Sequence, residues 1–108
     1  MLVQSNLALV ASTNERKITL YDLFDRYLKS VSKASADNIK YYINDFKELI
    51  EDKDLVDVTV DDIQFYIDYK KSLKLKDTTI YRYYRVLVTI FNYAVSHEYI
   101  DKNPCSRC

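Results

Sequence analysis

The stretch KDTTIYRYYRVLVTIFNYAVSHEYIDKNP, residues 76–104, predicts a long helix that its neighbours largely enclose. Apolar side chains form two adjoining stripes at helical spacing: Ile80, Tyr84, Leu87, Phe91, Ala94 and Val95, and Tyr83, Val86, Ile90 and Tyr93. One narrow polar stripe remains: Arg82, Arg85, Thr89, Asn92 and Ser96. We expect the helix to begin at Asp77 or Thr78 and to end near Ser96, before Asn103–Pro104 stops the chain. A partner could reach this helix only along its polar stripe.

Three further helices are predicted upstream, each from a start signal followed by apolar residues at helical spacing. The first begins at Thr19, with Asp22 completing a variant of the capping box, and the third begins at Thr59 with Asp62 in the same relation. The second begins near Ser35, a good N-cap. The expected inner positions are Leu20, Leu23, Phe24, Tyr27, Leu28 and Val31; then Ile39, Tyr42, Ile43, Phe46, Leu49 and Ile50; then Ile63, Tyr66, Ile67 and Leu73, widened by Phe65 and Tyr69.

The composition favours an all-α domain. The chain has 108 residues, no glycine and one proline, whereas tight β-hairpins and the phosphate loops of α/β folds depend on glycine. We expect a compact four-to-five-helix bundle over residues 18–104, a tail or linker at residues 1–17, and the start of another linker at residues 105–108. No stretch has the form of a signal peptide or the length of a membrane span, so we expect a soluble, cytoplasmic protein without membrane contact.

Charge is divided unevenly along the chain. The net charge is zero, which by itself counts against nucleic-acid binding. Residues 44–68, however, contain nine acids and two lysines, whereas residues 70–85 contain six bases and one acid, Asp77. The chain is therefore a charge dipole, which indicates an anionic partner on one side only.

Four segments, in order, resemble the core-binding domain of the tyrosine recombinases, the phage integrase family. ITLYDLFDRYLKS (18–30), SADNIKYYINDFKELI (35–50) and LVDVTVDDIQFYIDY (55–69) are similar to its first three helices. Residues 76–104 are the most specific part and match the family at Thr79, Ile80, Arg82, Leu87, Phe91, Ala94, Asn103 and Pro104. Two positions depart: Asn38 stands where Thr is usual, and Glu98 stands near a usual Gly. The resemblance implies a SAM-like, lambda-integrase-like helical bundle.

The resemblance also implies the DNA-binding half of a two-domain clamp. In the family a separate C-terminal domain carries the chemistry, with a nucleophilic Tyr supported by Arg, Lys and a His-x-x-Arg motif. The single histidine here, His97, is followed by Glu98, Tyr99 and Ile100, so this chain lacks that motif. The implied domain grips a half-site of duplex DNA for site-specific recombination, assembles with other recombinase protomers, and has no catalytic residue, cofactor or metal of its own.

The resemblance places the starts of the second and fourth helices against DNA. The candidate contacts are Ser35, Asn38, Lys40 and Tyr41 in the second helix, and Lys74, Lys76, Thr78, Thr79, Tyr81, Arg82 and Arg85 in and before the fourth. Clustered bases, here including Lys70 and Lys71, attract phosphates through charge and counterion release. Hydroxyls and N–H groups at a helix start add donors, and Asn38 or Tyr41 could read a base edge. Two plainer interpretations stay open: the lysines as a solvated helix end, and Ser35 as an ordinary N-cap.

We assign structural rather than functional roles to most tyrosines and to the two cysteines. Of the eleven tyrosines, those on apolar stripes are assigned to the core rather than to stacking on single strands: Tyr27, Tyr42, Tyr66, Tyr84 and Tyr93. Tyr41 and Tyr81 are expected to be exposed. Cys105 and Cys108 form a C-x-x-C pair that, with His97, offers too few ligands for zinc. We assign that pair to the linker.

Two further interpretations concern the acids and a rival function. The acidic run from Asp52 to Asp62 lacks the glycine and spacing of an EF-hand loop. It is expected to be a solvated face turned away from DNA. The alternative function is a SAM-like protein-interaction module without DNA binding, in which the opposite charge patches favour head-to-tail self-association.

Overall fold

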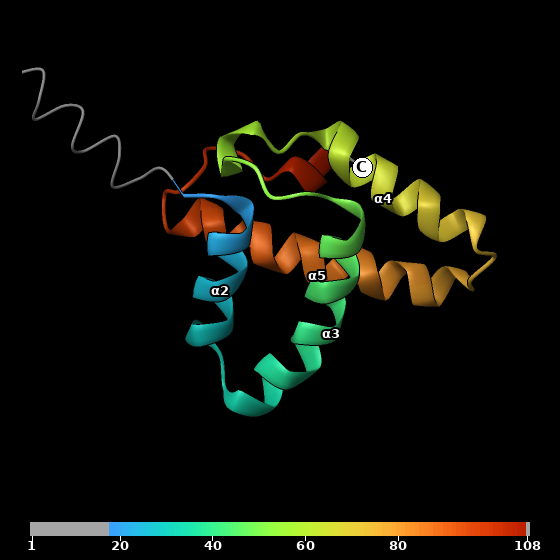
Figure 1. Cartoon of the computed structure of the whole chain (residues 1–108), viewed down its shortest axis with the longest axis horizontal. Coiled ribbons are helices and arrows are strands. Elements are labelled where there is room, and N and C mark those ends of the chain that lie inside the picture. Colours follow the sequence, from blue (N-terminus) through green and yellow to red (C-terminus); the bar gives the residue numbers. More distant parts are fainter. Residues whose placement is uncertain (1–17, 108) are drawn as a thin grey trace, which may run out of the picture.

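The computed structural model describes residues 18–107, with side chains through Cys105. In chain order the elements are α2 (Leu20–Ser30), α3 (Lys33–Leu49), the 3₁₀ turn η1 (Leu55–Asp57), α4 (Val60–Ser72), α5 (Asp77–Ser96) and the 3₁₀ turn η2 (Pro104–Arg107). Figure 1 shows α2 and α3 as a V beside the antiparallel pair of α4 and α5. The all-α prediction is confirmed. The predicted tail at residues 1–17, like Cys108, lies outside the described residues.

Helices α2 and α4 begin where predicted, because each has a capping box. Thr19 Oγ1 accepts from the Asp22 N–H, and an Asp22 carboxylate oxygen accepts from the Thr19 N–H, both at 3.1 Å. Thr59 and Asp62 make the same two bonds, at 3.3 and 3.0 Å. Each pair satisfies backbone donors that have no partner within their own helix.

Helix α3 begins earlier than predicted. Ser32, and not Ser35, is the N-cap, and Ser32 Oγ accepts from the Ser35 N–H at 3.2 Å. Both serines suit a cap chemically, but α2 already ends at Ser30, so the earlier serine meets the next helix first. Ser35 therefore lies in the first turn of α3, where its hydroxyl accepts from the Ser32 hydroxyl at 3.1 Å.

Helix α5 lies at the centre of the fold and packs against α2, α3, α4 and η2. Its buried side chains are Ile80, Tyr83, Leu87, Ile90, Phe91 and Ala94. A row of aromatic rings crosses the core from α2 to α5. Ring centroids lie 5.9 Å apart between Phe24 and Phe46, 4.8 Å between Phe46 and Tyr66, and 6.4 Å between Tyr66 and Tyr83. The core therefore ties all four helices together through edge contacts between rings.

The outer side of α4 differs from the prediction. Phe65, Tyr69 and Leu73 were expected inside but are 56%, 42% and 47% exposed. The helix ends at Ser72, so Leu73 leaves the helical spacing that would have turned it inward. The inner side of α4 consists of Ile63, Tyr66, Ile67 and Lys70. Phe65 and Tyr69 project from a different side of the same helix.

Cys105 belongs to the core, although the sequence pattern ended the folded unit at Pro104. Cys105 is fully buried. Its carbonyl accepts from Tyr84 Oη at 2.7 Å, and its N–H donates to Asn103 Oδ1 at 2.7 Å. The turn η2 packs between α4 and α5, and it is too short for apolar periodicity to reveal it. Since Cys108 lies outside the described residues, the geometry of the C-x-x-C pair is not part of the structure.

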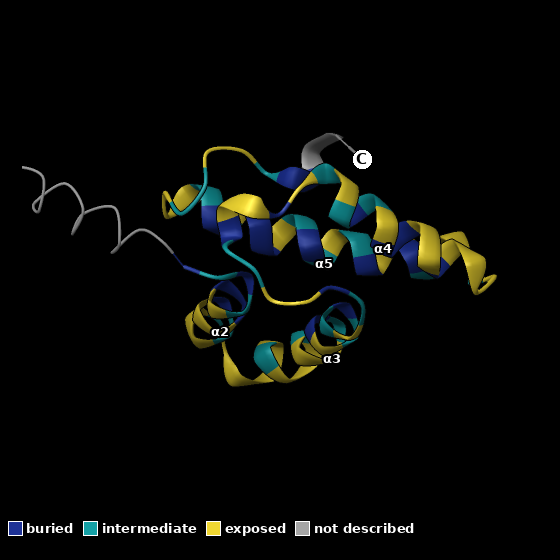
Figure 2. Ribbon diagram, turned by 45° about the horizontal axis from the view of Figure 1, so that its top comes forward, coloured by how far each residue is buried: buried dark blue, intermediate teal, exposed yellow. Residues whose placement is uncertain are grey.

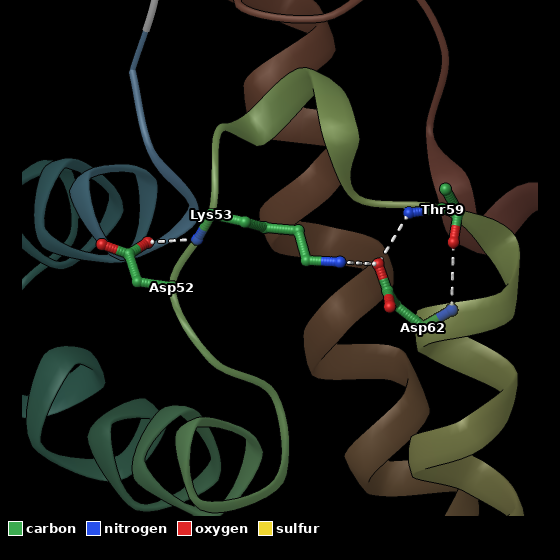
Figure 3. Close-up of polar contacts among 4 residues, drawn as sticks. All are labelled: Asp52, Lys53, Thr59 and Asp62. Atoms are coloured by element: carbon green, nitrogen blue, oxygen red, sulfur yellow. Dashed lines mark hydrogen bonds and ion pairs between the residues drawn. The ribbon is translucent and has the colours of Figure 1, made fainter.

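The acidic run after α3 is exposed at Asp52, Asp57 and Asp61, as a solvated face should be, but two of its carboxylates also have structural roles. Asp52 accepts from the N–H groups of Tyr21 and Lys53, both at 3.0 Å. Lys53 Nζ pairs with Asp62 at 2.9 Å, as Figure 3 shows. Burial raises the pKa of Asp62, but the bonds from Lys53 and Thr59 outweigh it and hold that pKa below its ordinary value. Asp62 is thus paired with a cation of the domain, and Asp52 joins the start of α2 to the segment after α3.

The C-terminus of α5 is a Schellman motif with glutamate at the position where glycine is usual. The Tyr99 N–H donates to the Ala94 carbonyl at 2.9 Å, and the Glu98 N–H donates to the Val95 carbonyl at 3.0 Å. Glu98 has a φ of 62°. This left-handed region costs a residue that carries a Cβ about 1–2 kcal/mol. The departure from the family at Glu98 therefore leaves strain in the backbone.

We expect Glu98→Gly to raise the free energy of unfolding by about 1 kcal/mol, because glycine adopts this φ without a steric penalty. Urea denaturation followed by circular dichroism measures the change. Glu98→Ala is the matched control, since it removes the same charge from the helix end but keeps the Cβ. Equal gains in the two variants would assign the effect to charge and contradict the prediction.

Candidate nucleic-acid interface

The polar stripe of α5 is exposed, as predicted, and carries the two arginines. Arg82, Arg85, Thr89, Asn92 and Ser96 all face solvent. Among the side chains described, those of residues 18–105, no carboxylate pairs with either arginine; the ion pairs given there are Lys53–Asp62 and Lys70–Asp45. Both guanidinium groups are therefore available to an external anion.

The connection from α4 to α5 carries the predicted lysines. Lys74 and Lys76 are exposed, and Figure 2 shows the tip of this hairpin as exposed. Lys76 is the N-cap of α5 but makes no side-chain capping bond. Thr78 is exposed and Thr79 half-buried in the first turn. Backbone N–H groups at an uncapped helix start suit a phosphate, while Asp77 in the same turn reduces that attraction.

Helix α3 contacts α5 through two of its tyrosines, Tyr41 and Tyr42. Tyr41 Oη lies 3.1 Å from Tyr83 Oη, and the Tyr42 ring centroid lies 5.1 Å from that of Tyr83. Tyr41 is 62% exposed, as predicted. Asn38 is also exposed and lies one turn before Tyr41 on the same side of α3. The structure thus brings Tyr41 of α3 into contact with Tyr83 of α5, which precedes Arg85 and follows Arg82 in the chain. No spacing in the sequence predicts this contact.

Two predicted residues, Lys40 and Tyr81, lie away from the place where Tyr41 meets α5. Lys47, two helical turns after Lys40 on the same side of α3, has its Nζ 4.6 Å from the Tyr21 ring centroid of α2. Lys40 is therefore exposed on the flank toward α2 and not toward α5. Tyr81 is 59% exposed. It borders a groove of about 300 Å³ between α4 and α5, lined by Gln64, Ile67, Lys71, Asp77, Ile80, Tyr81 and Tyr84.

Lys70 is not part of the exposed basic stretch, which corrects its place among the phosphate-attracting residues. Its side chain is 6% exposed, and Lys70 Nζ pairs with Asp45 of α3. Tyr66 Oη donates to the same Asp45 oxygen at 2.5 Å. Lys70 Nζ also lies 4.1 Å from the Tyr83 ring centroid, over its π face. The charge that reaches solvent therefore comes from the other bases of residues 70–85.

Sequence reasoning missed this buried network, which stands behind the exposed face. Burial and the bond to Asp45 raise the pKa of Tyr66 far above its ordinary value. The hydrogen bond with Tyr41 and, to a smaller extent, burial raise the pKa of Tyr83. Both phenols therefore stay protonated, and Tyr66 donates to Asp45. No spacing rule connects Asp45 to Lys70, because they lie on different helices and meet only in the folded domain.

Comparison with known structures finds the same fold in DNA-bound integrases. The chain is similar to a lambda integrase dimer bound to a COC′ core site, with a TM-score of 0.79 and 21% identity, over 93% of this chain and 30% of that chain. It is also similar to a lambda integrase tetramer bound to a Holliday junction, with a TM-score of 0.80 and 20% identity, over 98% of this chain and 36% of that chain. The chain thus spans about a third of those integrases.

Comparison of the sequence with protein families and with curated proteins gave different results. No curated protein matched. Residues 19–108, however, match the phage integrase SAM-like domain, which agrees with the family that the sequence motifs indicate. That domain is distinct from the catalytic domain of the integrases. Since the match covers nearly the whole chain, this protein belongs to the phage integrase SAM-like domain family.

Proposed function

We propose that this domain binds duplex DNA as the core-binding domain of a site-specific tyrosine recombinase and grips one half-site during recombination. The observation that carries the proposal is the exposed pair Arg82 and Arg85 on α5, which no carboxylate of the described residues engages. Tyr41 of α3 joins this surface through Tyr83. We call the surface formed by Arg82, Arg85, Lys74, Lys76 and Tyr41 the basic face.

The distribution of acids supports the proposal. Asp45 and Asp62 each form an ion pair with a lysine inside the domain, and Asp52 accepts from two backbone N–H groups. These carboxylates contribute less repulsion toward a phosphate backbone than the net charge of zero suggests. Electrostatic attraction of phosphates depends on the local charge of a face, and not on the sum over the chain.

The solved structures with this fold support the partners that we propose. They are a lambda integrase dimer bound to a COC′ core site and a lambda integrase tetramer bound to a Holliday junction. We infer that this domain likewise acts on duplex DNA beside further protomers, and that the strand chemistry belongs to a separate catalytic domain.

Among residues 18–107, no helix combines the length and the apolar character that a bilayer crossing requires.

Fluorescence anisotropy with labelled duplex DNA over a range of salt concentrations tests the proposal. We expect binding at low salt whose log K falls linearly with log[salt], by about 0.9 for each phosphate contact. Lys76→Glu should weaken binding to every duplex sequence, because phosphate contacts carry no sequence information. Absence of binding at low salt, or binding that Lys76→Glu leaves unaltered, would overturn the proposal.

A second candidate, a protein-interaction module, rests on one observation. Phe65 and Tyr69 are exposed one turn apart on α4, and Leu73 is exposed just after its end. Clustered apolar side chains on a surface mark interaction sites in many proteins. Sedimentation velocity at increasing protein concentration separates the candidates. Self-association that DNA does not affect would favour this second function, whereas a monomer that shifts only with DNA would favour the first.

Lys74 allows fold stability and DNA binding to be changed in opposite directions. Lys74 has a φ of 60°, and its N–H donates to the Lys71 carbonyl at 3.0 Å at the end of α4. We expect Lys74→Gly to stabilise the fold by about 1 kcal/mol through relief of the left-handed backbone, and to weaken DNA binding through loss of charge. Lys74→Ala should weaken binding equally without stabilising the fold. Unchanged affinity in both variants would remove Lys74 from the basic face.

A further inference from the structure

Two tyrosine hydroxyls join the basic face to the core of the domain. Tyr41 of α3 is exposed, while Tyr83 of α5 is buried, and their Oη atoms lie 3.1 Å apart. Over residues 18–107, Tyr41 is the one hydrogen-bond partner of the Tyr83 hydroxyl. A buried hydroxyl is stabilised by donating its hydrogen to an available acceptor. Either hydroxyl could be the donor in this bond. The arrangement in which the more buried Tyr83 donates leaves the hydrogen of the exposed Tyr41 for an acceptor outside the protein.

Tyr83 is held in place from several sides. Lys70 Nζ lies 4.1 Å from its ring centroid, and the ion pair with Asp45 fixes that ammonium group. Asp45 also accepts from Tyr66 Oη at 2.5 Å. The Tyr42 ring packs edge-on against Tyr83 at 5.1 Å between centroids. Moving Tyr83 would disturb a buried ion pair and an aromatic cluster, so its hydroxyl is a rigid reference for Tyr41.

Resting on the DNA binding proposed above, we propose that Tyr41 donates its hydroxyl hydrogen to a phosphate oxygen of the DNA backbone, and that Tyr83 is the positioning residue that orients Tyr41. A phosphate diester oxygen can only accept, so a hydroxyl that meets it must supply the hydrogen. The bond from Tyr83 occupies the Tyr41 oxygen as an acceptor and sets the direction of its O–H group. Arg82, exposed and next to Tyr83 in the chain, supplies the charge that draws a phosphate to this place.

The first test needs no DNA. The ¹³Cζ NMR resonance of a tyrosine responds to the hydrogen bonding of its hydroxyl. Tyr83→Phe should shift the Tyr41 resonance. Tyr99→Phe is the matched control, because it removes a hydroxyl that accepts from Arg26 at 3.2 Å beyond the far end of α5, and it should leave the Tyr41 resonance in place. An unshifted Tyr41 resonance in Tyr83→Phe would overturn the inference.

The second test measures affinity for two short duplexes, one rich in A·T and one rich in G·C, with variants whose folding circular dichroism confirms. Tyr41→Phe and Tyr83→Phe should each weaken binding to both duplexes by about tenfold. The double variant should bind no worse than either single one, because both remove the same contact. The salt dependence should not change, since no charge is lost. A purely structural role of Tyr83 would instead give additive losses.

The outcomes separate this inference from the proposed function. If the wild-type domain binds DNA, three results would each overturn the inference and leave the proposed function standing. These are an unchanged affinity of Tyr83→Phe, additive losses in the double variant, and a loss confined to one duplex. A wild-type domain that binds neither duplex at low salt would overturn the proposed function and the inference with it.

Discussion

Asp45→Ala will lower the free energy of unfolding by about 3–5 kcal/mol, because it leaves a buried ammonium group without its counterion. The Lys70 side chain is 6% exposed and pairs with Asp45. The same carboxylate accepts from the buried Tyr66 hydroxyl, which would also lose its acceptor. Urea denaturation followed by circular dichroism measures the loss. For a domain of this size such a loss is a large fraction of the total stability.

Two variants show whether the ion pair causes the effect. Asp45→Ala combined with Lys70→Met should recover much of the loss, because replacing both members of a buried pair removes the unpaired charge. Asp68→Ala is the matched control: Asp68 is exposed and accepts from Gln64 Nε2 at 2.9 Å, and its loss should cost no more than about 0.5 kcal/mol. A double variant as unstable as Asp45→Ala would contradict the role given to the pair.

Arg82→Glu together with Arg85→Glu will weaken duplex binding by about a hundredfold, roughly tenfold for each reversal. Both arginines are exposed on the same stripe of α5, so each reversal replaces attraction toward a phosphate with repulsion. The slope of log K against log[salt] should also become shallower by about 2, since each lost phosphate contact removes about 0.9. Anisotropy titrations at several salt concentrations measure both quantities.

Lys102→Glu is the control for the arginine reversals. Lys102 is exposed and follows α5 at the end opposite to the basic face. Its reversal makes the same change in net charge as either single arginine reversal, but elsewhere on the surface. Its effect should stay within about twofold once salt screens distant charges. Equal losses from Lys102→Glu and Arg82→Glu would mean that net charge controls binding, and the basic face would lose its special role.

Much of the fold follows from local pattern. The capping boxes at Thr19 and Thr59 formed as predicted, because their donors and acceptors lie three residues apart and need no distant partner. The exposed stripe of Arg82 and Arg85 was likewise predicted, because the spacing of a single helix determines which side is polar. Ser35 was assigned wrongly for an equally local reason. Two serines could cap α3, and the end of α2 selected Ser32.

Only part of the candidate site could be predicted from the sequence pattern. The exposure of Tyr41, Lys74 and Arg82 could be predicted, since each lies on a polar side or in a connection. The flank on which Lys40 lies could not, because that depends on where α2 packs against α3. The exposure of Phe65 on α4 depends in the same way on which side of that helix its neighbours cover.

The sequence by itself determined four amphipathic helices, their approximate limits and the polar side of α5, because these follow from intervals within one segment. Only the tertiary structure decided that Lys70 is a buried partner of Asp45 rather than an exposed base, that Cys105 is a core residue, and that Tyr83 meets Tyr41. Such contacts join helices whose separation in the chain exceeds any periodic interval. Their energies depend on burial, and burial exists only once the helices have packed together.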